Sequence, residues 1–146
     1  MEDTKLGVKT PATRFEELSV WQKSHQLVLR VYKMTAGFPK TETFGLAAQM
    51  RRASVSVPAN IAEGFKRRGR SDKARMLNIS QASLEELRYY FILAKDLGYA
   101  ATEGENAAVD EVARNAGSVH GNTAGAKGVT SAFRLLPPAF CLLPPD

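Results

Sequence analysis

The stretch Gln-Met-Arg-Arg-Ala-Ser-Val-Ser-Val-Pro-Ala-Asn-Ile-Ala-Glu-Gly-Phe-Lys-Arg-Arg-Gly-Arg, residues 49–70, decides the fold of this chain. Ala53, Val57, Ile61 and Gly64 recur at intervals of three or four residues, which is the spacing of one face of an α-helix. Because these residues are small, the pattern predicts a helix that packs closely against a neighbour. Pro58 removes one backbone hydrogen bond, so we expect the helix to kink there rather than end.

Six cations flank this predicted helix at its two ends: Arg51, Arg52, Lys66, Arg67, Arg68 and Arg70. Such side chains suit phosphate oxygens and need no base edges, so the pattern predicts contact with the backbone of RNA or DNA. The alternative is a solvated turn between helices. The loop Gly64–Arg70 follows a helix rather than a strand, which argues against the usual nucleotide-binding loop.

Asn60 and Glu63 lie on the same predicted helix, and we expect structural roles for both. Asn60 is placed to satisfy backbone groups freed by Pro58, and Glu63 to pair with Arg52 or with an arginine of a neighbouring subunit. General acid–base catalysis wants a second titratable group in a cleft, and the sequence offers no obvious partner. No catalytic residue is therefore predicted.

Capping signals divide the chain into four helices. The predicted N-caps are Ser19, Thr41 or Thr43, Ser71 and Thr102, and the predicted ends are Gly37–Pro39, Gly64, Gly98 and about residue 117. Thr102 and Glu105 form a capping-box pattern, but the helix that follows offers mainly alanine and valine to a core. We therefore expect the fourth helix to be short or degenerate.

Two smaller groups of residues complete the candidate sites. Of the aromatic run Tyr89, Tyr90 and Phe91, helical spacing predicts Phe91 in the core and one tyrosine on the surface or at an interface. His25 and His120 have no nearby ligands that would complete a metal site. The sequence predicts no metal and no cofactor.

Length and composition favour one soluble globular domain of 146 residues, 44% of them hydrophobic and 24% charged. No apolar run is long enough to cross a bilayer and no signal peptide is evident, so we expect a cytoplasmic protein without a membrane partner. Residues 1–101 carry a net charge of +7 (17 basic, 10 acidic), and residues 102–146 carry −2 (3 basic, 5 acidic). The positive field belongs to the first two thirds, which favours polyanionic partners.

The predicted domain organisation has three parts: a flexible arm over residues 1–14, a helical bundle over 15–117, and an irregular or disordered tail over 118–146. The tail repeats Ala-Phe-Arg-Leu-Leu-Pro-Pro, starting at Ala132, as Ala-Phe-Cys-Leu-Leu-Pro-Pro, starting at Ala139. A Pro-Pro pair in each copy excludes a continuous coiled coil. The two copies are nearly identical, as in translated repetitive DNA, and we interpret them as a sign that the reading frame lost its original C-terminus.

Four motifs over residues 15–100 resemble the bacterial four helix bundle proteins, also known as rRNA intervening-sequence proteins. They are Phe-Glu-Glu-Leu-Ser-Val-Trp-Gln-Lys from Phe15, Phe-Pro-Lys-Thr-Glu-Thr-Phe-Gly-Leu from Phe38, residues 49–64, and Ser-Leu-Glu-Glu-Leu from Ser83. The resemblance implies an all-α, antiparallel up-and-down four-helix bundle assembled as a homo-oligomeric ring of five. It also implies kinship with accessory proteins of diversity-generating retroelements, which bind nucleic acid and a reverse transcriptase, and no established enzymatic activity.

Three functional hypotheses follow. The first is a non-enzymatic oligomeric bundle that binds structured RNA or DNA through its basic turns, as an accessory to a larger enzyme. The second is a structural scaffold that docks a partner protein without nucleic acid. An enzyme that uses Glu63 as an acid or base is a third and weaker hypothesis.

Overall fold

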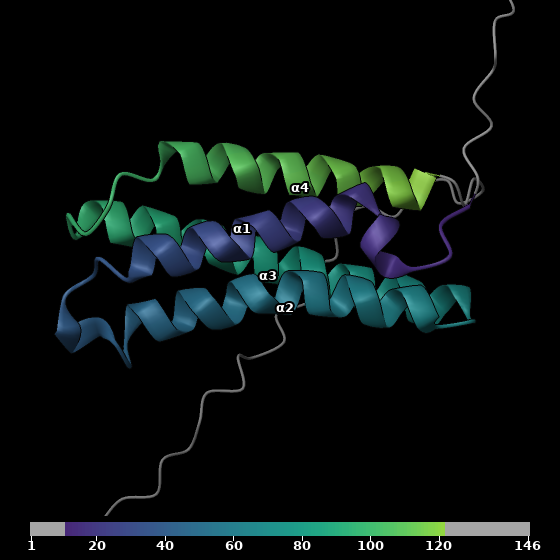
Figure 1. Cartoon of the computed structure of the whole chain (residues 1–146), viewed down its shortest axis with the longest axis horizontal. Coiled ribbons are helices and arrows are strands. Elements are labelled where there is room, and N and C mark those ends of the chain that lie inside the picture. Colours follow the sequence, from purple (N-terminus) through teal and green to yellow (C-terminus); the bar gives the residue numbers. More distant parts are fainter. Residues whose placement is uncertain (1–10, 122–146) are drawn as a thin grey trace, which may run out of the picture.

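A computed structural model describes residues 11–121 of the chain, with side chains as far as Ala116. Four helices account for most of this region: α1 Ser19–Thr35, α2 Leu46–Lys66, α3 Arg70–Asp96 and α4 Glu103–Gly121, with single 3-10 turns at Phe15–Glu17 and Lys40–Glu42. Consecutive helices run in opposite directions (Figure 1), so the prediction of an all-α, antiparallel up-and-down bundle is confirmed. The repeat that begins at Ala132 lies outside the described residues.

The core forms where the apolar stripes of all four helices meet. Val31 of α1, Val57 of α2, and Leu84 and Phe91 of α3 are fully buried. Their positions follow the helical periodicity of the sequence, because each stripe must leave water to stabilise the fold. Phe91 therefore lies in the core, as predicted, while its neighbour Tyr89 is 58% exposed.

The helices α2 and α3 approach each other closely along a surface of small residues. A Cβ atom added at Gly64 would lie only 3.0 Å from the Cβ of Met76 on α3. Farther along the pair, the Ser80 hydroxyl donates a hydrogen bond of 3.1 Å to the carbonyl of Val57. The prediction of a closely packed helix over residues 49–64 thus matches the structure, and α3 is the partner.

Helix α4 is longer than the sequence predicted. It has 19 residues, against 17 in α1, and it extends four residues past position 117. Its buried residues include Val109 and Val112. Three ion pairs also join its side chains to other helices: Lys23–Glu111 at 2.7 Å, Arg88–Asp110 at 2.7 Å and Lys95–Glu103 at 2.9 Å. The apolar content of α4 is modest, but its tertiary contacts with α1 and α3 stabilise it. Helix propensity does not measure such contacts, so the sequence pattern underestimated the length of this helix.

The N-caps predicted from sequence are wrong for the first three helices. The caps are Leu18, Gly45 and Gly69, and none of them makes a side-chain capping bond. Before α2, the Lys40–Glu42 turn places the Glu42 carboxylate so that it accepts a 2.9 Å bond from the Leu46 N–H. The Glu42 carboxylate therefore caps α2, although Glu42 lies four residues before the first residue of the helix.

In the loop between α3 and α4, the predicted end of α3 at Gly98 is confirmed, but the predicted capping box at Thr102 is not. Gly98 has a φ of 72°, and the bonds from Gly98 N–H to the Lys95 carbonyl and from Tyr99 N–H to the Ala94 carbonyl form a Schellman motif. At the other end, the buried Thr102 hydroxyl has no hydrogen-bond partner among the described residues. The Thr102 half of the predicted capping box is therefore not formed.

Pro58 lies inside α2 and is buried, and the helix continues past it to Lys66. The prediction that the helix would not end at this proline is confirmed. Across residues 11–121, no helix is long and apolar enough to span a membrane.

The close approach at Gly64 can be tested by adding side-chain volume there. We expect Gly64→Val to lower the free energy of unfolding by about 1–3 kcal/mol, because the new side chain overlaps Met76. Gly104→Ala is the matched control: nothing lies within 4 Å of its added Cβ, and alanine favours helix by up to about 1 kcal/mol. Urea unfolding measures both, and a Gly64→Val variant as stable as wild type would contradict the packing described here.

Candidate nucleic-acid interface

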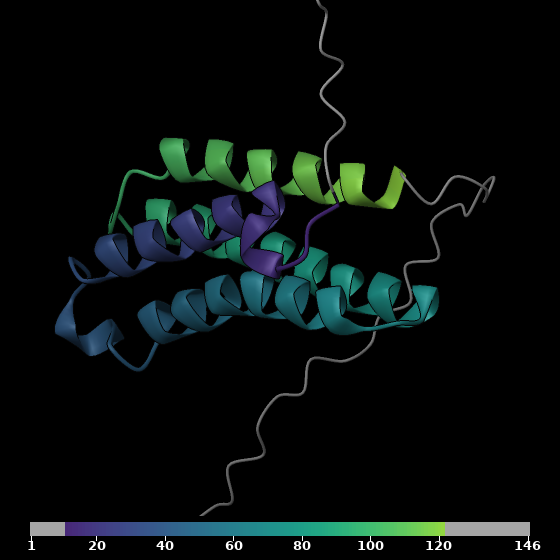
Figure 2. The same ribbon diagram turned by 45° about the vertical axis from the view of Figure 1, so that its right-hand side comes forward.

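Four of the six predicted cations gather where α2 leads into α3, at one end of the bundle (Figure 2). We call Lys66, Arg67, Arg68 and Arg70 the basic turn; all four side chains are exposed. Because α2 ends at Lys66 and α3 begins at Arg70, only three residues separate the two helices. Lys73 and Arg75 on α3 add two more exposed cations, so residues 63–75 carry a net charge of +4 (six basic, two acidic).

Only one cation of the basic turn forms an ion pair among the described side chains. Arg67 pairs with Glu63 one turn earlier on α2, and the hydrogen bond from this pair raises the pKa of Arg67. Within residues 11–116, no ion pair involves Lys66, Arg68 or Arg70. The pKa of Glu16 is lowered first by a backbone hydrogen bond and by Arg14, and to a smaller extent by the charge of Lys66. Arg68 and Arg70 are therefore the cations of the turn most open to an external anion.

Arg51 and Arg52 lie at the opposite end of α2, and the structure does not bring them to the basic turn. At 1.5 Å per residue, Arg51 and Arg67 are separated by roughly 24 Å along the helix axis. The Nε–H of Arg51 donates a 2.8 Å bond to the Thr35 hydroxyl, and its guanidinium lies 5.0 Å from the centre of the Tyr32 ring. Arg52 is exposed and donates to Gln49 at 3.1 Å.

The exposed stripe of α2 between these two groups is not basic. From one end to the other it consists of Arg52, Val55, Ala59, Glu63 and Lys66. Val55 is 42% exposed, and Glu63 carries a negative charge. The six predicted cations thus form two separate groups rather than one continuous positive surface.

Asn60 and Glu63 do not have the partners within the chain that the sequence suggested, and the pairing of Glu63 with an arginine of a neighbouring subunit stays a prediction. Asn60 Nδ2 donates a hydrogen bond of 2.7 Å to the carbonyl of Ser56, whereas the carbonyl freed by Pro58 belongs to Ser54.

Glu63 is half exposed and pairs with Arg67. Arg52 is eleven residues from Glu63, about 16 Å along the axis, and is out of reach. Glu63 lines neither the groove over α1 beside α4 nor the pocket between α1 and α2.

The aromatic side chains of α3 lie beside Arg52. The Tyr90 hydroxyl donates a 2.7 Å bond to Glu86, and the Tyr89 ring is tilted against Tyr90 at 5.8 Å. Burial, followed by the bond to Glu86, raises the pKa of Tyr90 to about 12. Tyr90 is thus a partly buried structural residue, and Tyr89 is the outward-facing tyrosine that the sequence predicted.

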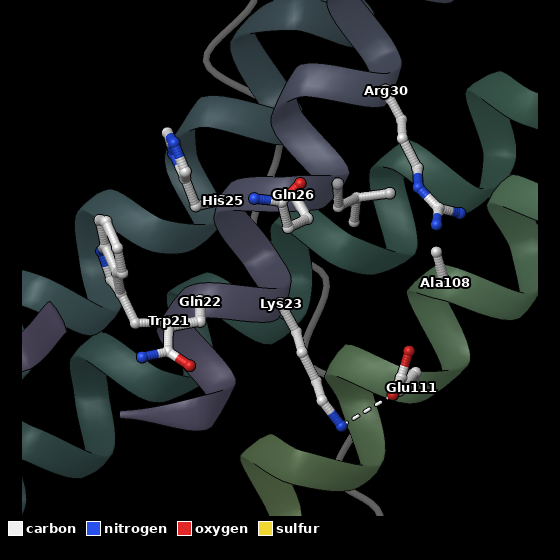
Figure 3. Close-up of a pocket in the computed structure, with 9 residues that line it drawn as sticks. Trp21, Gln22, Lys23, His25, Gln26, Arg30, Ala108 and Glu111 are labelled. Atoms are coloured by element: carbon white, nitrogen blue, oxygen red, sulfur yellow. Dashed lines mark ion pairs between the residues drawn. The ribbon is translucent and has the colours of Figure 1, made fainter. Parts of the chain in front are cut away.

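A groove of about 540 Å³ runs over α1 beside α4, with its lining side chains drawn in Figure 3. The His25 ring stacks on Trp21 at 5.2 Å, and Lys23 and Arg30 extend toward Glu111 and Ala108 of α4 (Figure 3). Within the described residues, no group of three or more His, Cys, Asp or Glu side chains could hold a metal ion. The side chain of His120 lies outside this part of the chain.

Comparison with known proteins identifies the family. Residues 16–121 match the 23S rRNA-intervening sequence proteins over most of the chain. The chain belongs to this family. A solved structure of a protein of unknown function from the S23 ribosomal protein family of Bacteroides thetaiotaomicron is 25% identical, with a TM-score of 0.62. The match covers 68% of this chain and 93% of that chain.

No functionally curated protein matches the chain. Neither the family nor the solved relative indicates an enzyme. The resemblance stated from the four sequence motifs is therefore confirmed, and it extends beyond residue 100 into α4 of this intervening-sequence protein.

The exposed Glu63–Arg67 pair predicts a small effect on stability. We expect Glu63→Gln to change the free energy of unfolding by less than about 1 kcal/mol, because surface ion pairs contribute little. Thermal and urea unfolding measure this change. A loss of several kcal/mol would contradict a surface role and indicate that Glu63 is needed inside an assembly.

The raised pKa of Tyr90 predicts a pH effect with a defined sign. Because folding raises this pKa from 10.0 to about 12, the folded state holds the phenol proton more tightly than the unfolded state. The resulting stability is fully present below pH 10 and is lost as pH rises toward 12. Absorbance titration at alkaline pH should lose its component near 12 in Tyr90→Phe, and an unchanged titration would contradict the assignment.

Proposed function

We propose that this intervening-sequence protein is a non-enzymatic, oligomeric bundle that binds structured RNA or DNA through the basic turn. The observation that carries the proposal is the cluster of exposed cations at the α2–α3 junction, of which Lys66, Arg68 and Arg70 form no ion pair in the described part of the chain. The family description names 23S rRNA, so a structured RNA is the first ligand to test. An accessory protein of a larger enzyme would use the same surface to bind its nucleic acid.

The geometry of the turn supports contact with phosphates rather than with bases. Guanidinium groups bind phosphate oxygens in a bidentate manner, and the turn presents three of them, at Arg67, Arg68 and Arg70. The closely packed helices α2 and α3 hold both ends of the short turn. Such contacts bind the backbone and give shape preference without reading sequence.

The exposed apolar side chains of α2 and α3 favour a second function, a scaffold for protein contact. Val55, Ile79 and Ile92 are 42%, 38% and 52% exposed, and Tyr89 lies on the same helix as the last two. Apolar groups of this kind are common at interfaces between proteins. We propose that copies of the chain, or a partner protein, cover them; a ring of five remains the arrangement that the family resemblance implies.

The salt dependence of nucleic-acid binding tests the first proposal. Four phosphate contacts predict that affinity for structured RNA falls about 10²-fold between 50 and 200 mM salt. In Arg68→Ala/Arg70→Ala, the slope of log affinity against log salt should become less negative by about 1.4–1.8, because two phosphate contacts are lost. Filter binding or mobility shift on RNA and on duplex DNA measures both quantities.

The matched control removes two exposed cations of α1, in Arg30→Ala/Lys33→Ala. This variant has the same net charge as the turn variant, so it separates a local contact from a general loss of positive charge. Equal slopes in the two variants would overturn the basic-turn mechanism. Absence of binding by wild type would leave the scaffold as the supported function.

A further inference from the structure

A small pocket lies between the end of α1, the Lys40–Glu42 turn and the start of α2. Its volume is about 130 Å³, and its lining includes Thr35, Phe38, Lys40, Thr43, Ala47 and Arg51. Of these lining residues, Phe38 and Ala47 are buried, whereas Lys40 is exposed. The lining therefore combines buried apolar side chains with two cations.

Arg51 is held in one orientation beside this pocket. Thr35, only 4% exposed, donates from its hydroxyl to the Val31 carbonyl at 2.8 Å and accepts the Nε–H of Arg51 at 2.8 Å. The Tyr32 ring supports the guanidinium from one side. Because only Nε is used in the bond to Thr35, the donors on the two Nη atoms remain for a ligand.

The charges around the pocket favour an anion. No carboxylate lines it, and the Glu42 oxygens accept from the Leu46 N–H at 2.9 Å and the Tyr99 hydroxyl at 3.1 Å. The carboxyl end of α1 and the amino end of α2 both reach the pocket, and their dipoles oppose each other. The formal charges of Lys40 and Arg51 therefore set the sign of the potential.

We propose that this pocket binds a single phosphate group between Lys40 and Arg51. A volume of 130 Å³ is the share of about four waters in the liquid, which suits one tetrahedral oxyanion. Pockets that enclose drug-sized ligands measure about 300 Å³ or more, so a whole nucleotide does not fit inside. The site takes either a free phosphate or the terminal phosphate of a longer molecule.

This site is independent of the basic turn. The two lie at opposite ends of α2, and they share no residue. The failure of one proposal therefore leaves the other standing.

Calorimetric titration with inorganic phosphate, against chloride at matched ionic strength, tests the proposal. We expect saturable binding that weakens at least about tenfold in Lys40→Ala and in Arg51→Lys, because each loses a charge or a bidentate contact. Lys40 is exposed and makes no ion pair within residues 11–116, so its variant should fold like wild type. Arg68→Ala/Arg70→Ala should keep full phosphate affinity; absent or unaltered binding in the two pocket variants would overturn the site.

The source of the phosphate is distinguished with a pair of short single-stranded RNAs, one with a 5′-phosphate and one with a 5′-hydroxyl. If the 5′-phosphate RNA binds more tightly and Lys40→Ala abolishes the difference, the pocket takes the end of a polynucleotide. If the two RNAs bind equally while inorganic phosphate saturates the pocket, the ligand is free phosphate. Both outcomes support the pocket and separate the two sources.

Discussion

The close approach of α2 and α3 is the constraint on which the rest of the structure depends. Gly64 leaves no room for a side chain against Met76, and the Ser80 hydroxyl bonds directly to the backbone of α2 at Val57. Two helices that touch in this way need only a short connection, and the basic turn consists of this connection and the helix ends beside it. The four cations are neighbours in the sequence, and the two packed helices hold the turn that carries them at one end of the bundle.

The fold could be predicted because the decisive signals are local. Ala53, Val57 and Ile61 share one helical face whatever surrounds them, and Gly98 adopts the positive φ that a Schellman motif requires. Helix starts were harder to predict, since a Ser or Thr near the right place is only a candidate. At α2, Glu42 reaches the first N–H from a 3-10 turn that the sequence pattern does not specify.

The candidate site was predictable as a set of cations but not as an arrangement. Charge and proximity in sequence identified Lys66, Arg67, Arg68 and Arg70, and the structure exposes all four. The positions of Thr35 and Lys40 beside Arg51 depend on how α1 packs on α2, so no local pattern reveals that pocket. Glu63 was mispaired for a simpler reason: its exposed neighbour Arg67 lies one helical turn away, whereas Arg52 lies three turns away.

The distribution of charge along α2 limits how one polyanion can bind. The roughly 24 Å between Arg51 and Arg67 corresponds to about seven base pairs at 3.4 Å each, so a duplex lying along the helix would span both groups. Such a duplex would also press its phosphates against the exposed Val55 and the carboxylate of Glu63, where it gains nothing. A ligand that approaches the end of the bundle at the α2–α3 junction meets the basic turn and avoids this stripe. For the proposed function, this distribution of charge therefore favours end-on contact over a duplex laid along α2, and it leaves the apolar middle of α2 and α3 for the proposed contact with protein.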